Sequence, residues 1–194
     1  MYLTRGIIPI ILCSQNRLLD NHQWHKFIWK CFKSDHRSFI HRTEDHDDSF
    51  YAYILSHDAP LIPDIGRWET KQIPDRFFNA ESYMFRVKVN PVVSKYVEGK
   101  KHGKRVGIYN SEEIINWFNK KGELSGFSVK DATIMSIQKE ICYKGSTRIT
   151  HSSADIQGVM KITDTNKFKE CVLGGIGNAS SKAFGFGLML LKQI

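Results

Sequence analysis

The sequence predicts an α+β protein whose two halves each run strand, helix, strand, strand, helix, strand. Two patterns lead to this prediction. Residues 21–32 carry apolar side chains with the period of a helix, and residues 82–89 alternate apolar and polar side chains as a half-buried strand does. The length of 194 residues suits one ordinary domain or two small ones that share an interface.

The first half opens with an apolar run over residues 2–12, which reads as a strand. The next segment, NHQWHKFIWKCF, predicts an amphipathic helix, because its apolar residues recur at i, i+3, i+4, i+7 and i+8. These residues are Trp24, Phe27, Ile28, Cys31 and Phe32. Asp20 and Gln23 are spaced as a capping pair, so the helix should begin just after Asp20.

Two strand-like runs follow this helix, at residues 37–44 and 49–57, and the polar DHDD between them reads as a hairpin loop. Residues 60–77 then contain three prolines and little periodicity. This composition favours a weak helix or turn near 62–69, an edge strand and a linker.

The second half begins with the alternating strand SYMFRVKV. A helix is expected over 111–121, where Ser111 can cap the start, acidic residues occupy the first turn, lysines occupy the last turn and Gly122 follows. Strands near 127–142 and 148–163, a short helix near 165–173 and a last strand over Leu188–Leu191 complete this half.

This order of elements is the split βαβ plan written twice, which predicts tandem ferredoxin-like (RRM-like, βαββαβ) domains. We place the N-terminal domain at 1–80 and the C-terminal domain at 81–194. A single larger α+β domain is the competing interpretation, and the weak element near 62–69 is where the repeat is least secure.

The composition is that of a packed protein with an excess of positive charge. The chain has 28 lysines and arginines against 20 aspartates and glutamates, a formal charge of +8 and a pI near 9.3. This balance favours a polyanion such as nucleic acid as partner, although it also serves solubility alone. No stretch approaches the roughly 18 apolar residues of a membrane span. The four cysteines are scattered, which is typical of reduced core residues in a cytoplasmic protein.

Two histidines one turn apart are the first candidates for chemistry. On a helical wheel His25 lies at the edge of the apolar stripe and His22 lies further toward solvent. Such a pair can act as acid and base near neutral pH. The alternative is structural, with His25 a hydrogen-bonded boundary residue and His22 a surface residue. The other histidines lie in other elements, so no metal site is expected.

Basic residues concentrate in three segments, and loops of this kind can follow a phosphate backbone. The candidates for contact with phosphates of a nucleic acid are Lys100, Lys101, Lys104 and Arg105 in the first segment, Lys139, Lys144 and Arg148 in the second, and Lys182 in the third. Each segment taken singly could equally be a solvated charged loop.

The third segment is rich in glycine, GGIGNASSKAFGFGLMLL. Its spacing matches neither a dinucleotide-binding loop nor a P-loop. It is better interpreted as a loop before the last strand whose bare backbone lies against a polyanion. Gly175, Gly177, Gly185 and Gly187 are therefore expected to lie against that polyanion.

Four patterns together resemble the CasE (Cse-type) CRISPR-associated endoribonucleases of type I-E Cascade. They are the opening MYLTRGIIP, the histidine-bearing helix DNHQWHKFIWKCF, the strand FRVKVNPV and the glycine signature GIGNASSKAFGFGLMLL. They span nearly the whole chain in the order of that family. The glycine signature followed by a terminal strand is the most specific of the four.

The resemblance implies an enzyme that cuts CRISPR repeat RNA at the base of its hairpin without a metal or cofactor. The 2′-hydroxyl would attack the adjacent phosphate, and the enzyme would stay on the hairpin beside other Cascade subunits. The family's catalytic histidine corresponds to His25. His22 stands where the family commonly has tyrosine, and could be a second proton-transfer group or only position the phosphate. The alternative function is a repeat-hairpin RNA-binding subunit that does not cleave.

Overall fold

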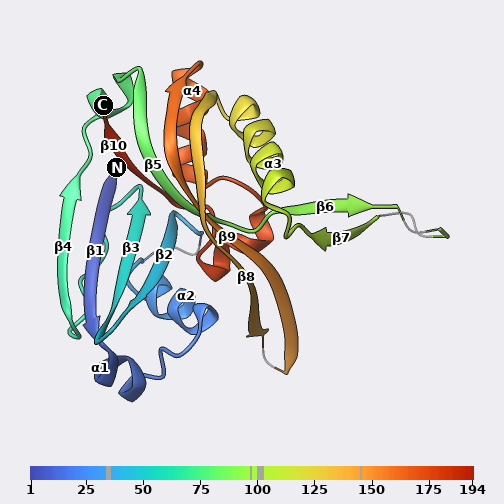
Figure 1. Ribbon diagram of the computed structural model, residues 1–194. Helices are drawn as coiled ribbons and strands as arrows, with labels where there is room; N and C mark the ends of the chain where they lie inside the picture. Colours follow the sequence, from blue (N-terminus) through green and yellow to red (C-terminus); the bar gives the residue numbers. More distant parts are fainter. Residues whose placement is uncertain (34–35, 97, 100–102, 145) are drawn as a thin grey trace.

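The computed structural model describes residues 1–33, 36–96, 98–99, 103–144 and 146–194. Within these ranges the chain forms two four-stranded antiparallel sheets, one two-stranded ribbon and helices packed on the sheets (Figure 1). None of the helices in this part of the chain is long and apolar enough to cross a membrane. Lys100 and Lys101, both candidates for RNA contact, lie outside the described residues.

The first sheet has the strand order β2-β3-β1-β4. Its strands are β1 (Tyr2–Pro9), β2 (Phe39–His46), β3 (Ser49–Ser56) and β4 (Arg67–Gln72), and the helices α1 (Ile10–Gln15) and α2 (Asn21–Trp29) come between β1 and β2. Trp24 and Ile28 of α2 are buried against Ile8, Ala52 and Ile54 of the sheet. The apolar stripe of the predicted helix is therefore what holds α2 on the sheet.

One local prediction for this half was wrong, and one choice that the sequence left open is decided. The strand expected over 2–12 ends at Pro9, where α1 begins, because proline has no N–H to continue the ladder. Near 62–69 the sequence favoured a weak helix or a turn; the described residues 57–66 form no helix, and the chain bends at 64–66 before β4. The prolines at positions 60 and 63 remove helical donors, and the chain then enters β4, the predicted edge strand, which pairs only with β1 among the described strands.

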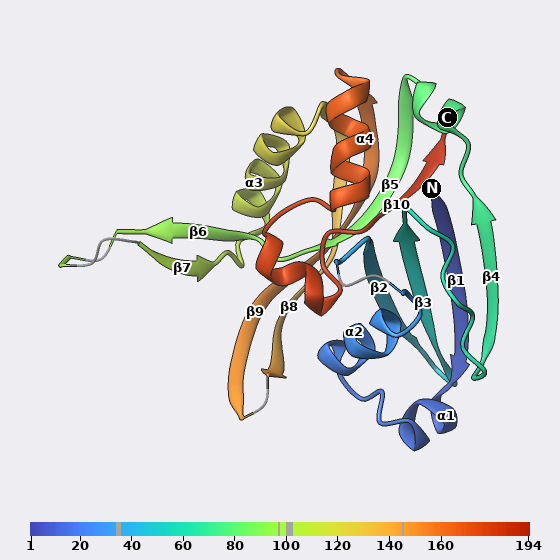
Figure 2. The same ribbon diagram turned by 180° about the vertical axis from the view of Figure 1, so that it is seen from behind.

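The second sheet has the strand order β10-β5-β9-β8. Its strands are β5 (Ser82–Val89), β8 (Phe127–Lys144), β9 (Thr147–Ile162) and β10 (Met189–Gln193), with the helices α3 (Ser111–Leu124) and α4 (Thr165–Gly174) on one face. The ribbon β6 (Val92–Lys95) and β7 (Lys104–Gly107) and the far ends of β8 and β9 extend beyond this sheet (Figures 1 and 2). Two short 3-10 helices, η1 (Asp75–Asn79) and η2 (Ala179–Phe184), precede β5 and β10.

The predicted start of α3 at Ser111 is confirmed, but the predicted capping residue and the predicted end were wrong. The side chain of Asn110, not that of Ser111, caps the helix by accepting from the amide of Glu113 at 3.0 Å. The helix also continues past Gly122 to Leu124, because Gly122 packs closely on the ring of Phe127 and needs no turn there.

Both sheets share one strand order when the strands are numbered within each unit, 4-1-3-2, and this is the predicted ferredoxin-like plan. The first unit lacks the second helix of that plan within its described residues. The strands of the first sheet come from residues 2–72 and those of the second from 82–193, which supports the division near residue 80 that we retain as a proposal. Ile40 and Leu55 of the first sheet join the core of the second, so the two units share apolar contacts.

Candidate active site and RNA-binding groove

The candidate site is built on the exposed edge of α2. The side chain of Asp20 accepts from the amide of Gln23 at 2.8 Å, which is the predicted N-terminal cap. Asn21 ties this end of α2 to both units, because it accepts from Thr43 of β2 at 3.1 Å and donates to Glu140 of β8 at 3.3 Å. His22 and His25 are therefore held at the junction between the two sheets.

His25 sits half-buried in an aromatic pocket. Its ring centre lies 5.5 Å from that of Trp29, 5.6 Å from that of Phe39 and 5.4 Å from that of His41. Burial lowers the pKa of His25 to about 4, and the positive charges of Arg37 and His22 act in the same direction. The imidazole is therefore neutral at pH 7 and carries a free lone pair, as a general base requires.

The glycine segment lies beside this helix and not apart from it. η2 packs on α2 and β2, and Figure 2 shows it between α2 and the β8–β9 hairpin. The ring of Phe184 is 6.1 Å from that of His22 and 4.8 Å from that of His151 on β9. The sequence predicted both features but gave no reason to place them together, because 150 or more residues separate them along the chain.

The four predicted glycines all have positive φ, between 75° and 95°, a region that favours glycine. Three of them, Gly175, Gly185 and Gly187, are buried, and Gly175 and Gly187 lie so close to Ile40 and Ile176 that a Cβ atom would clash. Their burial favours a role in shaping the loop over the expected contact with RNA. Gly177 is half-buried, and its contact with RNA remains a prediction.

Three predicted basic residues line one groove. This groove, about 560 Å³ in volume, is bounded by β7, β8, β9 and the glycine segment. Its polar and charged lining includes Lys104, Arg105, Lys139, His151, Asn178 and Ser180. Arg105 donates to the hydroxyl of Ser180 at 3.2 Å, so the ribbon and the glycine segment are joined there. Arg148 and Lys144 lie farther out, at the end of the β8–β9 hairpin.

Lys182 lies in η2, the part of the glycine segment that packs on α2. Burial lowers its pKa, and so does the charge of Arg37, which also lowers the pKa of His25 and His41. Arg37 is thus a cation whose charge acts on His25, His41 and Lys182 alike. The sequence identified Lys182 but not Arg37, which lies in an exposed segment before β2 with no motif of its own.

Two further histidines escaped the sequence reasoning. His41 is 1% exposed and lies beneath His25, and His151 faces the groove. One signal was present for His41: it shares a strand face with Phe39, and a polar residue at a core position is unusual. Among the described residues, no three His, Cys, Asp or Glu side chains are grouped to hold a metal ion.

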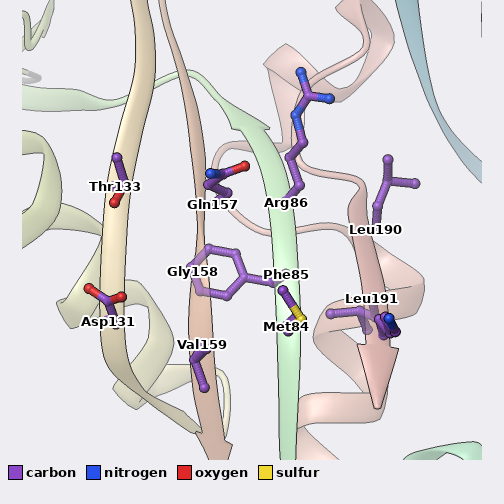
Figure 3. A pocket seen from close by; sticks show the side chains of 11 residues that line it. Met84, Phe85, Arg86, Asp131, Thr133, Gln157, Gly158, Val159, Leu190 and Leu191 are labelled. Atoms are coloured by element: carbon purple, nitrogen blue, oxygen red, sulfur yellow. The ribbon is translucent and has the colours of Figure 1, made fainter. Parts of the chain in front are cut away.

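Another hollow, of about 450 Å³, lies on the open face of the second sheet (Figure 3). Met84 and Arg86 of β5, Gln157 of β9 and Leu190 of β10 are among its lining residues. None of the residues that the sequence selected for catalysis or RNA contact lines it, and we assign it no role in the site.

The buried His41 predicts a specific pH dependence of stability. Burial lowers the pKa of His41 to about 3, so below pH 6.5 the unfolded chain binds a proton that the folded chain does not. This histidine should therefore reduce the free energy of unfolding by about 2 kcal/mol between pH 7 and pH 5. Urea unfolding of wild type and His41→Phe at both pH values measures this difference. Equal pH dependence of the two proteins would contradict it.

Comparison with known proteins agrees with these features. A sequence model of the family described as CRISPR associated protein matches residues 1–193. A search of curated proteins finds no match. The structure of the CRISPR endoribonuclease Cse3 bound to 19 nt RNA is similar over 99% of this chain and 100% of its own, with a TM-score of 0.84 and 17% identity.

Two further structures cover this chain and their own completely. The CRISPR-associated protein Cas6e from Escherichia coli str. K-12 has a TM-score of 0.78 and 24% identity. A chain of a CRISPR RNA-guided surveillance complex, pre-nicking, has a TM-score of 0.76 and 17% identity. At these identities the likenesses establish the tandem ferredoxin-like fold. With the family match over nearly the whole length, the chain belongs to the CRISPR-associated protein family, and the CasE resemblance carried by its sequence motifs is confirmed.

Proposed function

We propose that this protein is a metal-independent endoribonuclease that cleaves CRISPR precursor RNA at the repeat hairpin. It then stays bound to the guide RNA as a subunit of a Cascade complex in the cytoplasm. The similar structures support this proposal, since one is an endoribonuclease bound to RNA and another belongs to an RNA-guided surveillance complex. The observation that carries it is the neutral, half-buried His25, on which the charge of Arg37 acts and against whose helix the segment with Lys182 packs.

The chemistry follows from these charges. Neutral His25 takes the proton of the 2′-hydroxyl as its oxygen attacks the adjacent phosphorus, and the bond to the 5′-oxygen breaks. The products are a 2′,3′-cyclic phosphate and a 5′-hydroxyl, which needs one proton. His22, one turn away on α2, is the group we assign to this transfer or to holding the phosphate. Lys182 and Arg37 offset the negative charge that develops on the phosphoryl oxygens.

The direct test is cleavage of repeat RNA by wild-type protein in EDTA. Cleavage at the 3′ base of the hairpin, with a cyclic phosphate on the upstream product, is the expected result. An unrelated hairpin of equal length is the control and should remain intact. Tight binding of the repeat without cleavage would overturn the enzyme proposal and favour the alternative, a hairpin-binding subunit of the complex.

The basic groove predicts a strong dependence of RNA binding on salt. If about six phosphates are contacted, affinity should fall roughly 10³-fold between 50 and 200 mM salt, because counterions are released on binding. Replacing Lys104 and Lys139 with glutamine should reduce the slope of log K against log salt by about 2. Lys71→Gln on β4, outside the groove, is the matched control. A slope unchanged by the double variant would exclude these two lysines as phosphate contacts.

A further inference from the structure

His41 is an unusual residue for the place it occupies. It lies in the middle of β2, is 1% exposed, and packs among Phe39 and the side chains under α2. Both of its ring nitrogens are buried and have no hydrogen-bond partner among the described residues. Burying a polar group in this way costs about 1–3 kcal/mol, and a phenylalanine would avoid that cost. Such an exception needs a reason, and a catalytic neighbour is one.

The neighbour of His41 is His25. Their ring centres are 5.4 Å apart and their planes differ by only 26°. Nδ1 of His25 is also buried without a partner in the described part of the chain. Both rings of this pair thus carry unpartnered nitrogens. A separation of 5.4 Å between the ring centres leaves room for one nitrogen–nitrogen hydrogen bond when a nitrogen of each ring points toward the other.

We propose that His41 is a positioning residue for His25, accepting a hydrogen bond from its Nδ1–H during the reaction. This inference rests on the proposed function, in which His25 is the base. A base that uses Nε2 must carry its own proton on Nδ1, and the partner of Nδ1 decides which tautomer is present. His41 stabilises that tautomer by accepting from Nδ1–H, a role that a carboxylate has in other enzymes.

The proton balance is simple. The O–H bond of the 2′-hydroxyl breaks and an N–H bond forms at Nε2 of His25, while the proton already on Nδ1 stays and is shared with His41. His41 neither gains nor loses a proton, and its acceptor nitrogen must stay unprotonated so that it can accept from Nδ1–H of His25. The charged and titratable groups that act on this pair favour that state, since Arg37 before β2 acts on both rings and His22 acts on His25. Their positive charges disfavour protonation of either imidazole.

Two variants separate positioning from packing. His41→Phe keeps an aromatic ring and removes both nitrogens, and His41→Gln keeps a side chain that accepts a hydrogen bond. Each is compared with wild type in affinity for a 2′-deoxy, uncleavable repeat RNA and in single-turnover cleavage between pH 5 and pH 8. The ¹⁵N shifts of His25 report its tautomer directly.

His41→Phe should bind RNA as wild type does but cleave about 10–100-fold more slowly, as when the outer partner of a reacting histidine is removed. Its His25 should lose the pure Nδ1–H tautomer, and His41→Gln should recover part of both properties. Cleavage by His41→Phe at the wild-type rate with an unchanged pH profile would overturn the proposal.

The test of His41 can succeed or fail independently of the proposed enzymatic function. If wild-type protein binds repeat RNA but does not cleave it, the enzyme proposal fails while the tautomer of His25 still tests the contact. A His25 tautomer that is the same in wild type and both variants would overturn the role of His41 in either case. If His41→Phe does not fold, the ¹⁵N shifts of His25 in wild-type protein still decide, because a mainly Nε2–H tautomer would overturn the role of His41.

Discussion

Replacing His25 with alanine is expected to slow cleavage of repeat RNA by about 10²–10⁴-fold, the usual contribution of a positioned acid or base. Affinity for uncleavable RNA should stay within a few-fold, because the groove lined by Lys104, Arg105 and Lys139 is untouched. Single-turnover cleavage in EDTA measures the rate, and a binding titration measures affinity. The reason is geometric: His25 is the half-buried, neutral imidazole at the junction of the two units.

The matched control is His46→Ala. His46 lies at the β2–β3 turn, is 45% exposed and pairs with Glu44 at 3.5 Å, so its loss should leave the rate within about twofold. His22→Ala then decides the role of the second histidine. A loss of cleavage rate comparable with that of His25→Ala would indicate proton transfer, and a loss of RNA affinity alone would indicate phosphate positioning. Activity retained in His25→Ala would contradict the assignment of the base.

The sequence predicted those parts of the site that depend on local spacing. The apolar period of α2 and the cap at Asp20 placed His22 and His25 on one edge of a helix before any contact was known. Alternation and helix signals likewise gave the order of strands in the second unit. These features depend on residues within one or two turns of each other, which is why a single sequence carries them.

The parts that the sequence missed depend on non-local packing. His41 contacts His25 because β2 packs against α2 in the folded chain. The glycine segment contacts α2 because it leads into β10, which pairs with β5 at the edge of the second sheet. The absent helix before β4 is a different case. The sequence left a weak helix or a turn open there. The repeat of the plan favoured the helix, whereas the two prolines favour the bend that forms instead.

Removing Arg42 should destabilise the protein by about 3–5 kcal/mol, the usual loss when a buried ion pair is broken from one side. The Arg42 side chain is 2% exposed and contacts Glu44 at 2.6 Å and Asp155 at 2.9 Å. Arg86 completes the network at 2.7 Å from Asp155 and 3.6 Å from Glu44. Arg42→Met keeps most of the volume but leaves two largely buried carboxylates with one arginine. Urea unfolding measures the change.

The control for Arg42→Met is Arg5→Met, because Arg5 pairs with Glu69 at 3.2 Å across the first sheet but both side chains are about half exposed. That exposed pair should contribute less than about 1 kcal/mol. Adding Glu44→Gln and Asp155→Asn to Arg42→Met should recover much of the loss, since the uncompensated charge is then removed. Equal losses for Arg42→Met and Arg5→Met would contradict the network's role. If these losses are observed, the network links β2, which carries His41, to β9, which carries His151. It then holds the His25–His41 pair and the RNA-binding groove in a fixed relative position.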